Sequence, residues 1–361
     1  MMIGIKELLR QPGRFASVGV ALTVLVVLLT VLGGFLDGLE LNQTGPYRAH
    51  EGRLLVFSEQ SENLIQRSEL NKAQATQLAE VDGVAAVGAL NQIASTASAS
   101  DGEILDIVLF GYDLATDVLP PPPSDGAVAD DAMAESNDVA AGDTLIVGAN
   151  SEPVIVASVV GDLSQGSPTV WVSTNRWREI VEVSNPAALP PEDVNQALVI
   201  EPVPDADLDL LAADLSSIDG ISAVTASGAI DSLPVVQQQS TTFEGIIGLT
   251  YVVTLLVVAL FFALITLERI GLYAVLKAVG AGTKDLMAGI SAQAVCVSAV
   301  ALILGFGISL IFINVLPADL PVRLVPSRLG QIAVGVVFTS IIGSLFSLRR
   351  VLRIDPAEAI G

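Results

Sequence analysis

The sequence predicts an α-helical membrane protein with four transmembrane helices and a large extracytoplasmic α/β domain that carries a β-rich insert. Of the 361 residues, 52% are hydrophobic and the mean hydropathy is +0.64, which is too apolar for an ordinary soluble protein. Four uncharged runs reach the roughly 20 residues that a membrane-spanning helix needs. Between the first and second runs, residues 38–244 hold 32 of the 39 acidic residues but only 6 basic ones.

The four predicted transmembrane helices are residues 15–36, 245–267, 287–316 and 329–348. The first follows a short amphipathic segment, residues 1–14, which contains Lys6, Arg10 and Arg14 and is expected at the cytoplasmic interface. Its apolar run is longer than the 7–15 residues typical of a secretory signal. We therefore expect an uncleaved anchor.

The orientation follows from the basic residues. They cluster before the first helix, in the 268–286 segment and in the tail, residues 349–361. The positive-inside rule places these three regions in the cytoplasm, so that both termini of this multi-pass chain lie inside the cell membrane. Residues 37–244 and the loop 317–328 are then outside. Arg323 and Arg328 in that loop are exceptions to the positive-inside rule, but the three cytoplasmic clusters contain more basic residues.

The extracytoplasmic domain contains an internal repeat of strand, helix and strand. The sequences VDGVAAV (residues 81–87) and IDGISAV (residues 218–224) occupy the same place in each copy. Gly83 and Gly220 are expected to end a helix in the left-handed conformation, and Ser68 to begin the first helix as its N-cap. Two such units, within residues 45–98 and 195–235, predict a ferredoxin-like α/β body.

An insert, residues 99–194, separates the two copies. Four runs rich in Val and Ile predict strands, and the insert is therefore expected to be all-β. Residues 120–138 begin with four consecutive prolines and continue with Asp, Ala and Ser. This composition predicts a loop.

Residues able to carry catalysis are scarce. The chain has one histidine, His50, and one cysteine, Cys296, which lies inside the third predicted helix. A histidine-based triad, a multi-histidine metal site and a disulfide are therefore excluded within one chain. The run GAGTKDL (residues 280–286) lacks the spacing of a phosphate-binding loop. The acidic outer domain disfavours nucleic acid. We expect no catalytic residue, no metal and no cofactor bound by this chain.

The polar segment 268–286 joins the second and third predicted transmembrane helices. It has a rough apolar stripe and is expected to form a cytoplasmic helix that Gly280 ends. Because the helix is held between two membrane spans, a force applied to it moves both of them.

The layout of one span, a large outer domain and three further spans resembles the MacB/FtsX-like family of ABC transporter permeases. Three sequences carry the resemblance: Leu-Glu-Arg at 267–269, LKAVGAGTKDL from residue 276, and Asp-Pro-Ala-Glu-Ala at 355–359. The family resemblance implies a porter-like outer domain, a homodimer, and a coupling helix that docks on a separate ABC ATPase, which binds ATP-Mg. The residues implied for ATPase coupling are Glu268, Arg269, Leu276, Lys277, Ala278, Gly280 and Ala281.

Phrases such as GDTLIVG and VVGDLSQGSPTVWVS resemble the HrtB-like haem exporters and DevC-like permeases of this family. That resemblance implies extrusion of a hydrophobic or amphipathic substrate, haem or lipid-like, from the membrane. Tyr47, His50 and Tyr251 are candidates for contact with it, since Tyr and His can ligate haem iron. The alternative interpretation is that these residues are anchors at the membrane interface, where tyrosines are expected. Two alternatives stay open: an FtsX-like regulator that moves an outer partner without transport, and a sensor without an ATPase.

Two further sets of residues have structural interpretations. Gly305, Gly307, Gly335 and Gly343 are expected to be helix-packing sites. Asp37 is expected to mark the membrane boundary.

Overall fold

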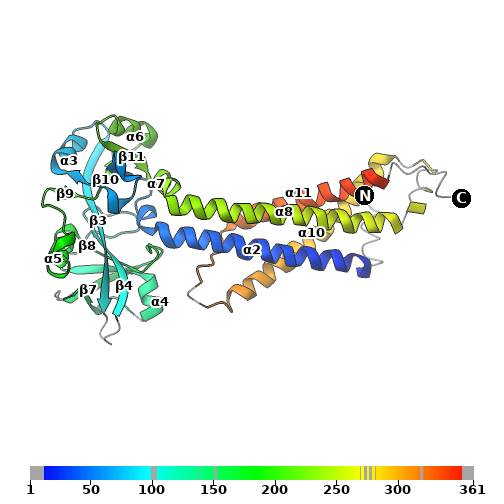
Figure 1. The fold of residues 1–361 in the computed structure, drawn as a ribbon, viewed down its shortest axis with the longest axis horizontal. Helices are drawn as coiled ribbons and strands as arrows, with labels where there is room; N and C mark the ends of the chain where they lie inside the picture. Colours follow the sequence, from blue (N-terminus) through cyan, green and yellow to red (C-terminus); the bar gives the residue numbers. More distant parts are fainter. Residues whose placement is uncertain are drawn as a thin grey trace. The chain divides into compact units, whose positions relative to one another are not determined.

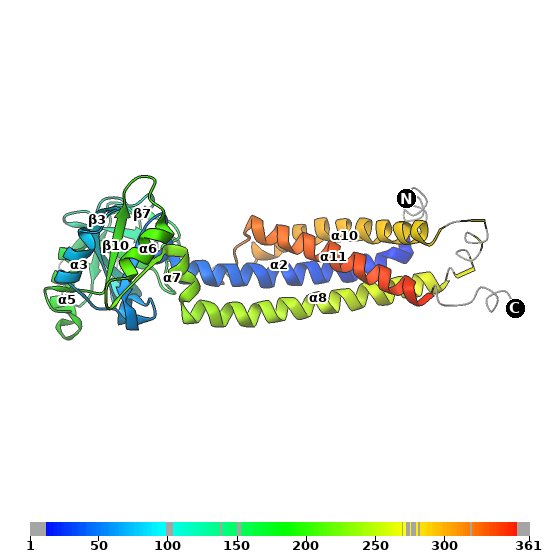
Figure 2. The same cartoon turned by 90° about the horizontal axis from the view of Figure 1, so that it is seen from above.

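The computed structural model describes residues 12–98, 104–137, 139–149, 153–268, 270–271, 275, 279–280, 282–317 and 320–351. The chain divides into two compact units. The sheet unit is Glu40–Gln238, and the helical unit combines Met1–Leu39 with Gln239–Gly361. Figures 1 and 2 show the elements of each unit in two views.

One part of the sheet unit, built from the N-terminal and C-terminal segments of that unit, has the ferredoxin-like fold. Its elements are β1 (Leu54–Ser58), α3 (Lys72–Ala79), β3 (Val84–Ser98), β10 (Ala197–Pro202), α6 (Leu208–Ser216) and β11 (Ile221–Thr225). The strands lie in the order β11–β1–β10–β3, and every neighbouring pair is antiparallel. Each helix therefore connects two strands that have a third strand between them, which is the split βαβ arrangement. This confirms the predicted body.

The two faces of this sheet bury alternate residues of β1. Leu54 and Val56 lie in one apolar cluster with residues of α3 and α6, whereas Leu55 and Phe57 lie in a second cluster. This is the two-residue period expected of a strand that is buried on both faces. Two short 3-10 helices, η1 (Glu59–Ser61) and η2 (Ile65–Arg67), follow β1.

Gly83 and Gly220 have the predicted left-handed conformation but do not end the helices, and the N-cap prediction is wrong. Helix α3 ends at Ala79 and α6 at Ser216, each with a right-handed C-cap residue, so both glycines lie in the turns that lead into β3 and β11. Gly83 has φ +96° and Gly220 has φ +75°, both in the left-handed region. The N-cap of α3 is Asn71, which forms a capping box with Gln74. Ser68 instead accepts a hydrogen bond from the backbone N–H of Ser58 (2.8 Å). A short strand, β2 (Leu70–Asn71), which pairs with β9 (Val194–Asn195), delays the helix start.

The insert extends the sheet. It contributes β4 (Ile104–Tyr112), β5 (Gly126–Asp130), β6 (Thr144–Val147), β7 (Pro153–Val160) and β8 (Thr169–Ser173). The order continues as β3–β4–β8–β5–β7–β6, and β6 pairs back with the far end of β3 through Ala97–Val147 and Ser98–Ile146. Six strands thus close into a ring that shares β3 with the ferredoxin-like body.

Two expectations for the insert are wrong. The stretch 120–138 is not a loop throughout, because it contains strand β5 and helix α4 (Asp131–Asn137). Ala127, Val128 and Ala129 of β5 are fully buried between β7 and β8. The insert is not all-β either, because α5 (Thr174–Ser184) buries Trp177, Ile180 and Val181 against the same core. Tertiary burial here overrides the weak strand propensity of alanine.

The helical unit is built on four long helices: α2 (Pro12–Arg48), α8 (Pro234–Glu268), α10 (Thr283–Ile313) and α11 (Pro326–Val351). Each contains a segment long and apolar enough to cross a membrane. Helix α2 extends 12 residues beyond the predicted span end at 36, and α8 starts well before residue 245. Gly38, Gly45 and Pro46 in the α2 extension have poor helix propensity, so tertiary packing, such as that of Tyr47 and Val236 in the sheet-unit core, continues the helices past the apolar run. The 1–11 part of the predicted amphipathic segment and residues 352–361 of the tail lie outside the described residues.

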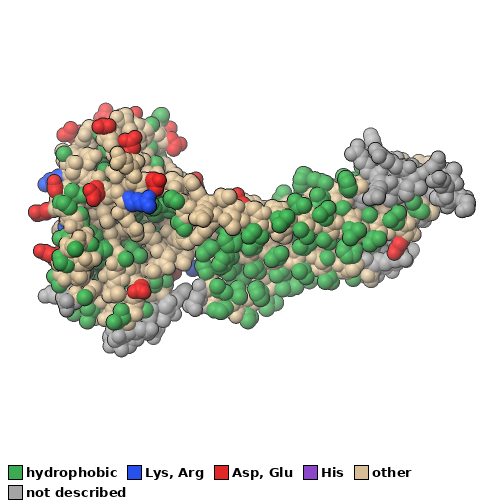
Figure 3. Space-filling view, viewed as in Figure 1, with side chains coloured by type: hydrophobic (Ala, Val, Ile, Leu, Met, Phe, Trp, Pro, Cys, Tyr) green, Lys and Arg blue, Asp and Glu red, His purple; other side chains and the backbone are tan. Residues whose placement is uncertain are grey.

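Small residues bring these helices into close contact. An added Cβ would lie 2.5 Å from Val26 at Gly305, 2.6 Å from the Tyr251 ring at Gly335 and 2.9 Å from the Leu255 carbonyl oxygen at Gly343. These three predicted packing sites are confirmed. No atom lies within 4 Å of such a Cβ at Gly307, so that prediction is wrong. Figure 3 shows apolar side chains over the visible face of the helices and carboxylates over that of the sheet unit.

Candidate functional site

Two glycines of α2, Gly34 and Gly38, form a groove for the segment that precedes α11. A Cβ at Gly38 would lie 1.8 Å from the Pro321 carbonyl oxygen, and one at Gly34 would lie 3.0 Å from that of Arg323. The backbone N–H of Arg323 also donates to the Gly34 carbonyl oxygen (2.9 Å). Only glycine permits this backbone-to-backbone approach. The 320–325 segment is therefore held directly on α2.

An ion pair closes the same contact. Arg328, in the first turn of α11, donates from Nε to Asp37 Oδ1 (3.0 Å) and from Nη2 to the same oxygen (2.6 Å). The side chains are 24% and 10% exposed. A charge-assisted pair through two nitrogens is among the stronger side-chain contacts. Asp37, expected to mark a boundary, thus has a specific partner, and Arg328 enters this region as its counter-ion.

A cavity of about 590 Å³ opens beside this ion pair. Residues of α2, α8 and α11 line it: Leu29, Ile247, Tyr251, Arg328, Gly330, Gln331, Ile332, Val334 and Gly335. Most of this wall is apolar; Arg328 brings the charge, and Tyr251 and Gln331 bring polar atoms. Such a lining is typical of small-molecule pockets, which measure 300–1,000 Å³.

The three predicted substrate-contacting residues belong to two different units. Tyr251 lines the cavity of the helical unit, whereas Tyr47 and His50 belong to the sheet unit and are each 1% exposed. Burial lowers the pKa of His50 to about 4. His50 Nδ1 lies 2.8 Å from the Pro46 carbonyl oxygen and donates to it. The Tyr47 and His50 side chains therefore lie in the core of the sheet unit.

Of the predicted coupling residues, the structure describes two. Glu268 is the last residue of α8, and Gly280 has φ +104°. The backbone N–H of Val279 donates to the carbonyl oxygen of Val275, four residues earlier (3.0 Å). Val275 and Val279 are 60% and 83% exposed. Arg269, Leu276, Lys277, Ala278 and Ala281 lie outside the described residues.

The two helices that leave the sheet unit are rooted in one core. Tyr47 of α2 and Ala49 just after it lie in the same apolar cluster as Leu233 and Val236 at the start of α8. That cluster also contains Trp171 of β8, against which Phe110 of β4 stacks with ring centroids 4.2 Å apart. The core therefore joins both helices to both halves of the sheet.

The end of α2 is also fixed by the loop between β7 and β8. A Cβ at Gly45 would lie 2.3 Å from the Leu163 carbonyl carbon, and Gly45 N–H donates to the Ser164 carbonyl oxygen (3.1 Å). Ser164 Oγ in turn donates to the buried carboxyl of Asp130 (2.5 Å). Burial, followed by the hydrogen bond with Asp131, raises the pKa of Asp130 to about 7.

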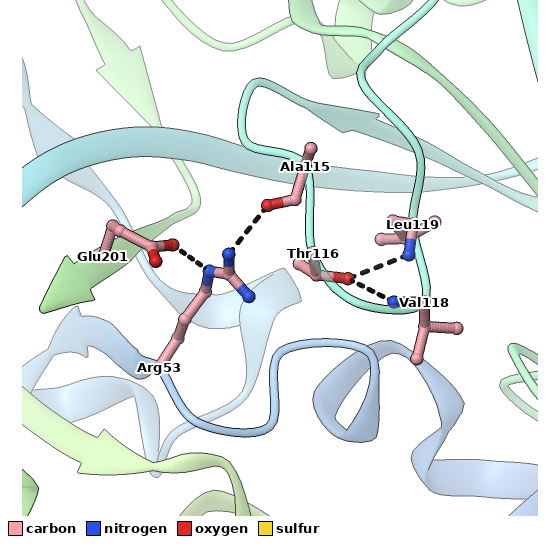
Figure 4. A network of polar contacts seen from close by, with 6 residues as sticks. All are labelled: Arg53, Ala115, Thr116, Val118, Leu119 and Glu201. Carbon is pink, nitrogen blue, oxygen red and sulfur yellow. Dashed lines mark hydrogen bonds and ion pairs between the residues drawn. The ribbon is translucent and has the colours of Figure 1, made fainter. Parts of the chain in front are cut away.

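A further polar network holds the loop after β4 on the ferredoxin-like body (Figure 4). Arg53 donates to Glu201 and, through Nη2, to the Ala115 carbonyl oxygen (2.9 Å). Thr116 Oγ1 accepts from the backbone N–H groups of Val118 (3.2 Å) and Leu119 (2.8 Å). The network joins strand ends of the body to the insert and has the character of a structural contact.

Comparison with known proteins identifies the second part of the helical unit. Residues 245–356 match the FtsX-like permease C-terminal family. The chain carries an FtsX-like permease domain. It covers α8, α10 and α11, the last three of the four helices that are apolar enough to span a membrane. The predicted resemblance to FtsX-like permeases is confirmed over these residues.

Curated relatives match over part of their length. A putative hemin transport system permease protein HrtB of Staphylococcus haemolyticus is 31% identical over 147 residues, 41% of this chain and 42% of the relative. An uncharacterized ABC transporter permease of Mycobacterium bovis is 34% identical over 113 residues, 31% of this chain and 32% of the relative. The matches thus span less than half of the relatives' length.

Solved structures show distant similarity. The periplasmic region of MacB from Actinobacillus actinomycetemcomitans has a TM-score of 0.36 at 14% identity, covering 50% of this chain and 91% of that one. The extracellular domain of the ABC-type transporter YknZ from Gram-positive bacteria has a TM-score of 0.33 at 16% identity, covering 48% and 100%. The strand order and pairings described above define the fold of the sheet unit independently of these scores.

Sequence reasoning missed the contact between Asp37 and Arg328. The signal was present as GGFLDG at residues 33–38, three glycines and a carboxylate on one stretch of helix. Glycines at this spacing predict that another segment packs closely against the helix, but they do not identify that segment. Arg328 is 291 positions away and was treated as an exception to the orientation rule.

Proposed function

We propose that the chain is the membrane subunit of an ABC-type exporter that couples ATP hydrolysis on a separate ATPase to movement of the sheet unit. In this proposal the sheet unit is extracytoplasmic and both termini lie in the cytoplasm with the 268–286 segment. ATP-Mg binds to the partner ATPase, and two copies of the chain act together in the cell membrane.

The common core of the sheet unit carries the proposal. Because Tyr47 of α2 and Val236 of α8 are packed in one buried cluster, a movement of either helix is transmitted to the sheet. Protein interiors are close-packed and transmit displacement instead of absorbing it. In this proposal, α2 and α8 therefore transmit movement from the membrane helices to the sheet unit.

The other end of α8 supports the ATPase contact. Glu268 ends this helix, and α10 begins at Thr283, so the segment between them is bound covalently to two membrane helices. The exposed valines at 275 and 279 are four residues apart, a spacing that places both on one face of a helix. Such a face suits docking into a groove of a partner.

The substrate class is proposed from the helical unit and from the relatives. The apolar cavity beside Tyr251 suits a hydrophobic or amphipathic molecule taken from membrane lipid. The printed name of the Staphylococcus haemolyticus relative refers to hemin transport, so hemin is the first substrate to test. An exposed loop at residues 120–138 could have received the outer partner of a regulator without transport, but this stretch contains a buried strand and a helix.

The test uses the full chain with the ABC ATPase that co-purifies with it, reconstituted together in liposomes. ATP-dependent release of hemin is measured for the wild type, Gly280→Pro and Lys277→Glu. Both substitutions are expected to reduce release at least ten-fold while the chain still inserts, since they alter the end and the charge of the docking helix. Lys284→Glu, an equal charge reversal at the start of α10, is the matched control and retains release.

Each failure has its own meaning. Full release from both docking variants removes the coupling role from this segment. The absence of any co-purifying ATPase overturns the exporter as a whole. ATP hydrolysis that proceeds without release of hemin or lipid supports the regulator instead.

A further inference from the structure

The cavity beside Tyr251 combines two kinds of surface that a simple lipid contact does not need. Leu29, Ile247, Ile332 and Val334 give it apolar walls. Arg328 also lines it, and its side chain is 24% exposed. A partly desolvated guanidinium at the edge of an apolar chamber favours a ligand that has both an apolar body and an acidic head.

The guanidinium already has an acidic partner on the opposite side. Asp37 accepts from its Nε and Nη2, and the amide oxygen of Gln331 accepts from Nη1 at 3.4 Å. A ligand anion that enters the cavity therefore meets Arg328 while Asp37 still holds it. The two anions compete for one cation, so the ligand affinity depends on the carboxylate of Asp37.

We propose that this cavity binds the chain of an anionic amphiphile whose acidic head pairs with Arg328 in competition with Asp37. The inference deepens the proposed export function, on which it rests for its meaning, by assigning the substrate a negative head. Arg328 is then a specificity-determining residue and Asp37 its internal competitor. Tyr251 and Gln331 supply polar atoms beside the head.

The competition connects ligand binding to the glycine groove. Asp37 lies between Gly34 and Gly38, the two residues on which the 320–325 segment rests. When the ligand head takes over Arg328, the ion pair that fixes the start of α11 to α2 is lost. Occupation of the cavity thereby loosens the contact that the glycines create.

The test measures binding of three radiolabelled probes to the full-length chain in phosphatidylcholine nanodiscs, with empty nanodiscs subtracted. Hexadecyl sulfate has the chain and a permanent negative charge, hexadecanol has the chain alone, and hexadecyltrimethylammonium has the opposite charge. Inorganic sulfate is added as a competitor that has only the head. Hexadecyl sulfate is expected to bind at least ten-fold more tightly than the other two probes, and millimolar sulfate is not expected to displace it.

Four variants locate the site. Arg328→Gln is expected to lower the affinity for hexadecyl sulfate to that for hexadecanol, and Arg328→Lys to recover part of the preference. Asp37→Asn is expected to tighten hexadecyl sulfate binding about ten-fold without affecting hexadecanol, because the competitor is gone. Gly330→Leu fills the cavity from a position with no atom within 4 Å of its Cβ, and both probes should weaken.

The control for the cavity variant is Gly307→Leu, also in a helix with no atom near its Cβ and outside the lining. It should leave all affinities unchanged. If Asp37→Asn and Arg328→Gln weaken hexadecyl sulfate alike, the ion pair is only structural and the inference falls. It also falls if the wild type shows no charge preference or if Gly330→Leu binds normally. The binding measurements use neither the ATPase nor ATP, so their failure is distinguishable from a failure of ATP-driven release, which tests the proposed function.

Discussion

The sheet unit and the helical unit use polar side chains in opposite ways. In the sheet unit these side chains connect residues far apart in the sequence: Arg53 binds Glu201, Asn91 Nδ2 donates to Asn195, and Arg48 Nη2 donates to the Asp162 carbonyl oxygen. In the helical unit, hydroxyls bond within their own helix. Thr23, Thr30, Thr254 and Ser309 each donate to the carbonyl oxygen four residues earlier.

The difference indicates which unit changes shape. Long-range hydrogen bonds must break before parts of the sheet unit separate, and each broken buried bond leaves unpaired groups at a cost of about 1–3 kcal/mol. Hydroxyls that bond their own helix leave the contact between helices to apolar and small side chains, which can slide. The Asp37–Arg328 pair, which joins α2 to α11, is therefore the polar contact most exposed to change when helices move.

The largest expected effect comes from adding one methyl group at two glycines of the same helix. Gly45→Ala places Cβ against the Leu163 backbone, and Gly38→Ala places it against Pro321. We expect Gly45→Ala to destabilise the sheet unit by about 3 kcal/mol or more, because backbone must move. Both tryptophans of the chain, Trp171 and Trp177, are buried in that unit, so the urea midpoint of tryptophan fluorescence reports on it alone.

The same measurement separates the units. Gly38→Ala should leave the fluorescence midpoint unchanged while lowering the thermal midpoint of helix loss followed by circular dichroism. Gly19→Ala, also in α2 but with no atom within 4 Å of the new Cβ, is the control and should be neutral. A fluorescence shift in Gly38→Ala as large as that in Gly45→Ala would show that the two units do not unfold separately.

A smaller effect is expected from pH within the sheet unit. Asp130 has a pKa of about 7, above its ordinary value, so its stabilising contribution is lost as pH rises from about 4 to 7. His50 has a pKa of about 4, below its ordinary value, so its contribution is lost as pH falls from 6.5 to 4. The two effects oppose each other in the wild type.

Removing either titrating side chain should reveal the pH dependence of stability that the other one causes. As the pH rises from 4.5 to 7.5, Asp130→Asn should gain stability relative to wild type, on the order of 2 kcal/mol. As the pH falls below 6.5, His50→Gln should gain stability relative to wild type. The urea midpoint of tryptophan fluorescence is measured at each pH. If both variants follow the wild-type profile, burial does not perturb these groups as described.

The smallest effect is expected from an ion pair at the edge of the sheet unit. Glu201→Gln should cost less than about 1 kcal/mol, because the Glu201 side chain is 37% exposed and solvent screens the pair. Glu62→Gln breaks the Arg67–Glu62 pair, whose side chains are 62% and 63% exposed, and should have no measurable effect. A larger loss for Glu62→Gln than for Glu201→Gln would reverse the ranking by burial.

Prediction from the sequence succeeded where a local pattern determines the structure. The ferredoxin-like repeat was visible in the two Asp-Gly pairs, because the turns that lead into β3 and β11 place residues 83 and 220 in the left-handed conformation, which favours glycine. The four transmembrane helices followed from apolar length alone. Strands β4, β6, β7 and β8 were visible in their β-branched residues.

Prediction failed where distant residues decide. Strand β5 has the sequence GAVAD, with little intrinsic strand preference, and forms because β7 and β8 bury it. Asp37 and Arg328 meet only once α2 and α11 are packed. Tyr47 and His50 follow an apolar run and were expected at a membrane interface, but α2 continues to Arg48 and carries them into the sheet core.

Strand β3 has a consequence for how the sheet unit responds to load. Its 15 residues pair with β10 near one end and with β4 and β6 near the other. A hinge between the ferredoxin-like body and the six-stranded ring would have to bend this strand and shear its ladders. The two lobes are therefore expected to move as one piece.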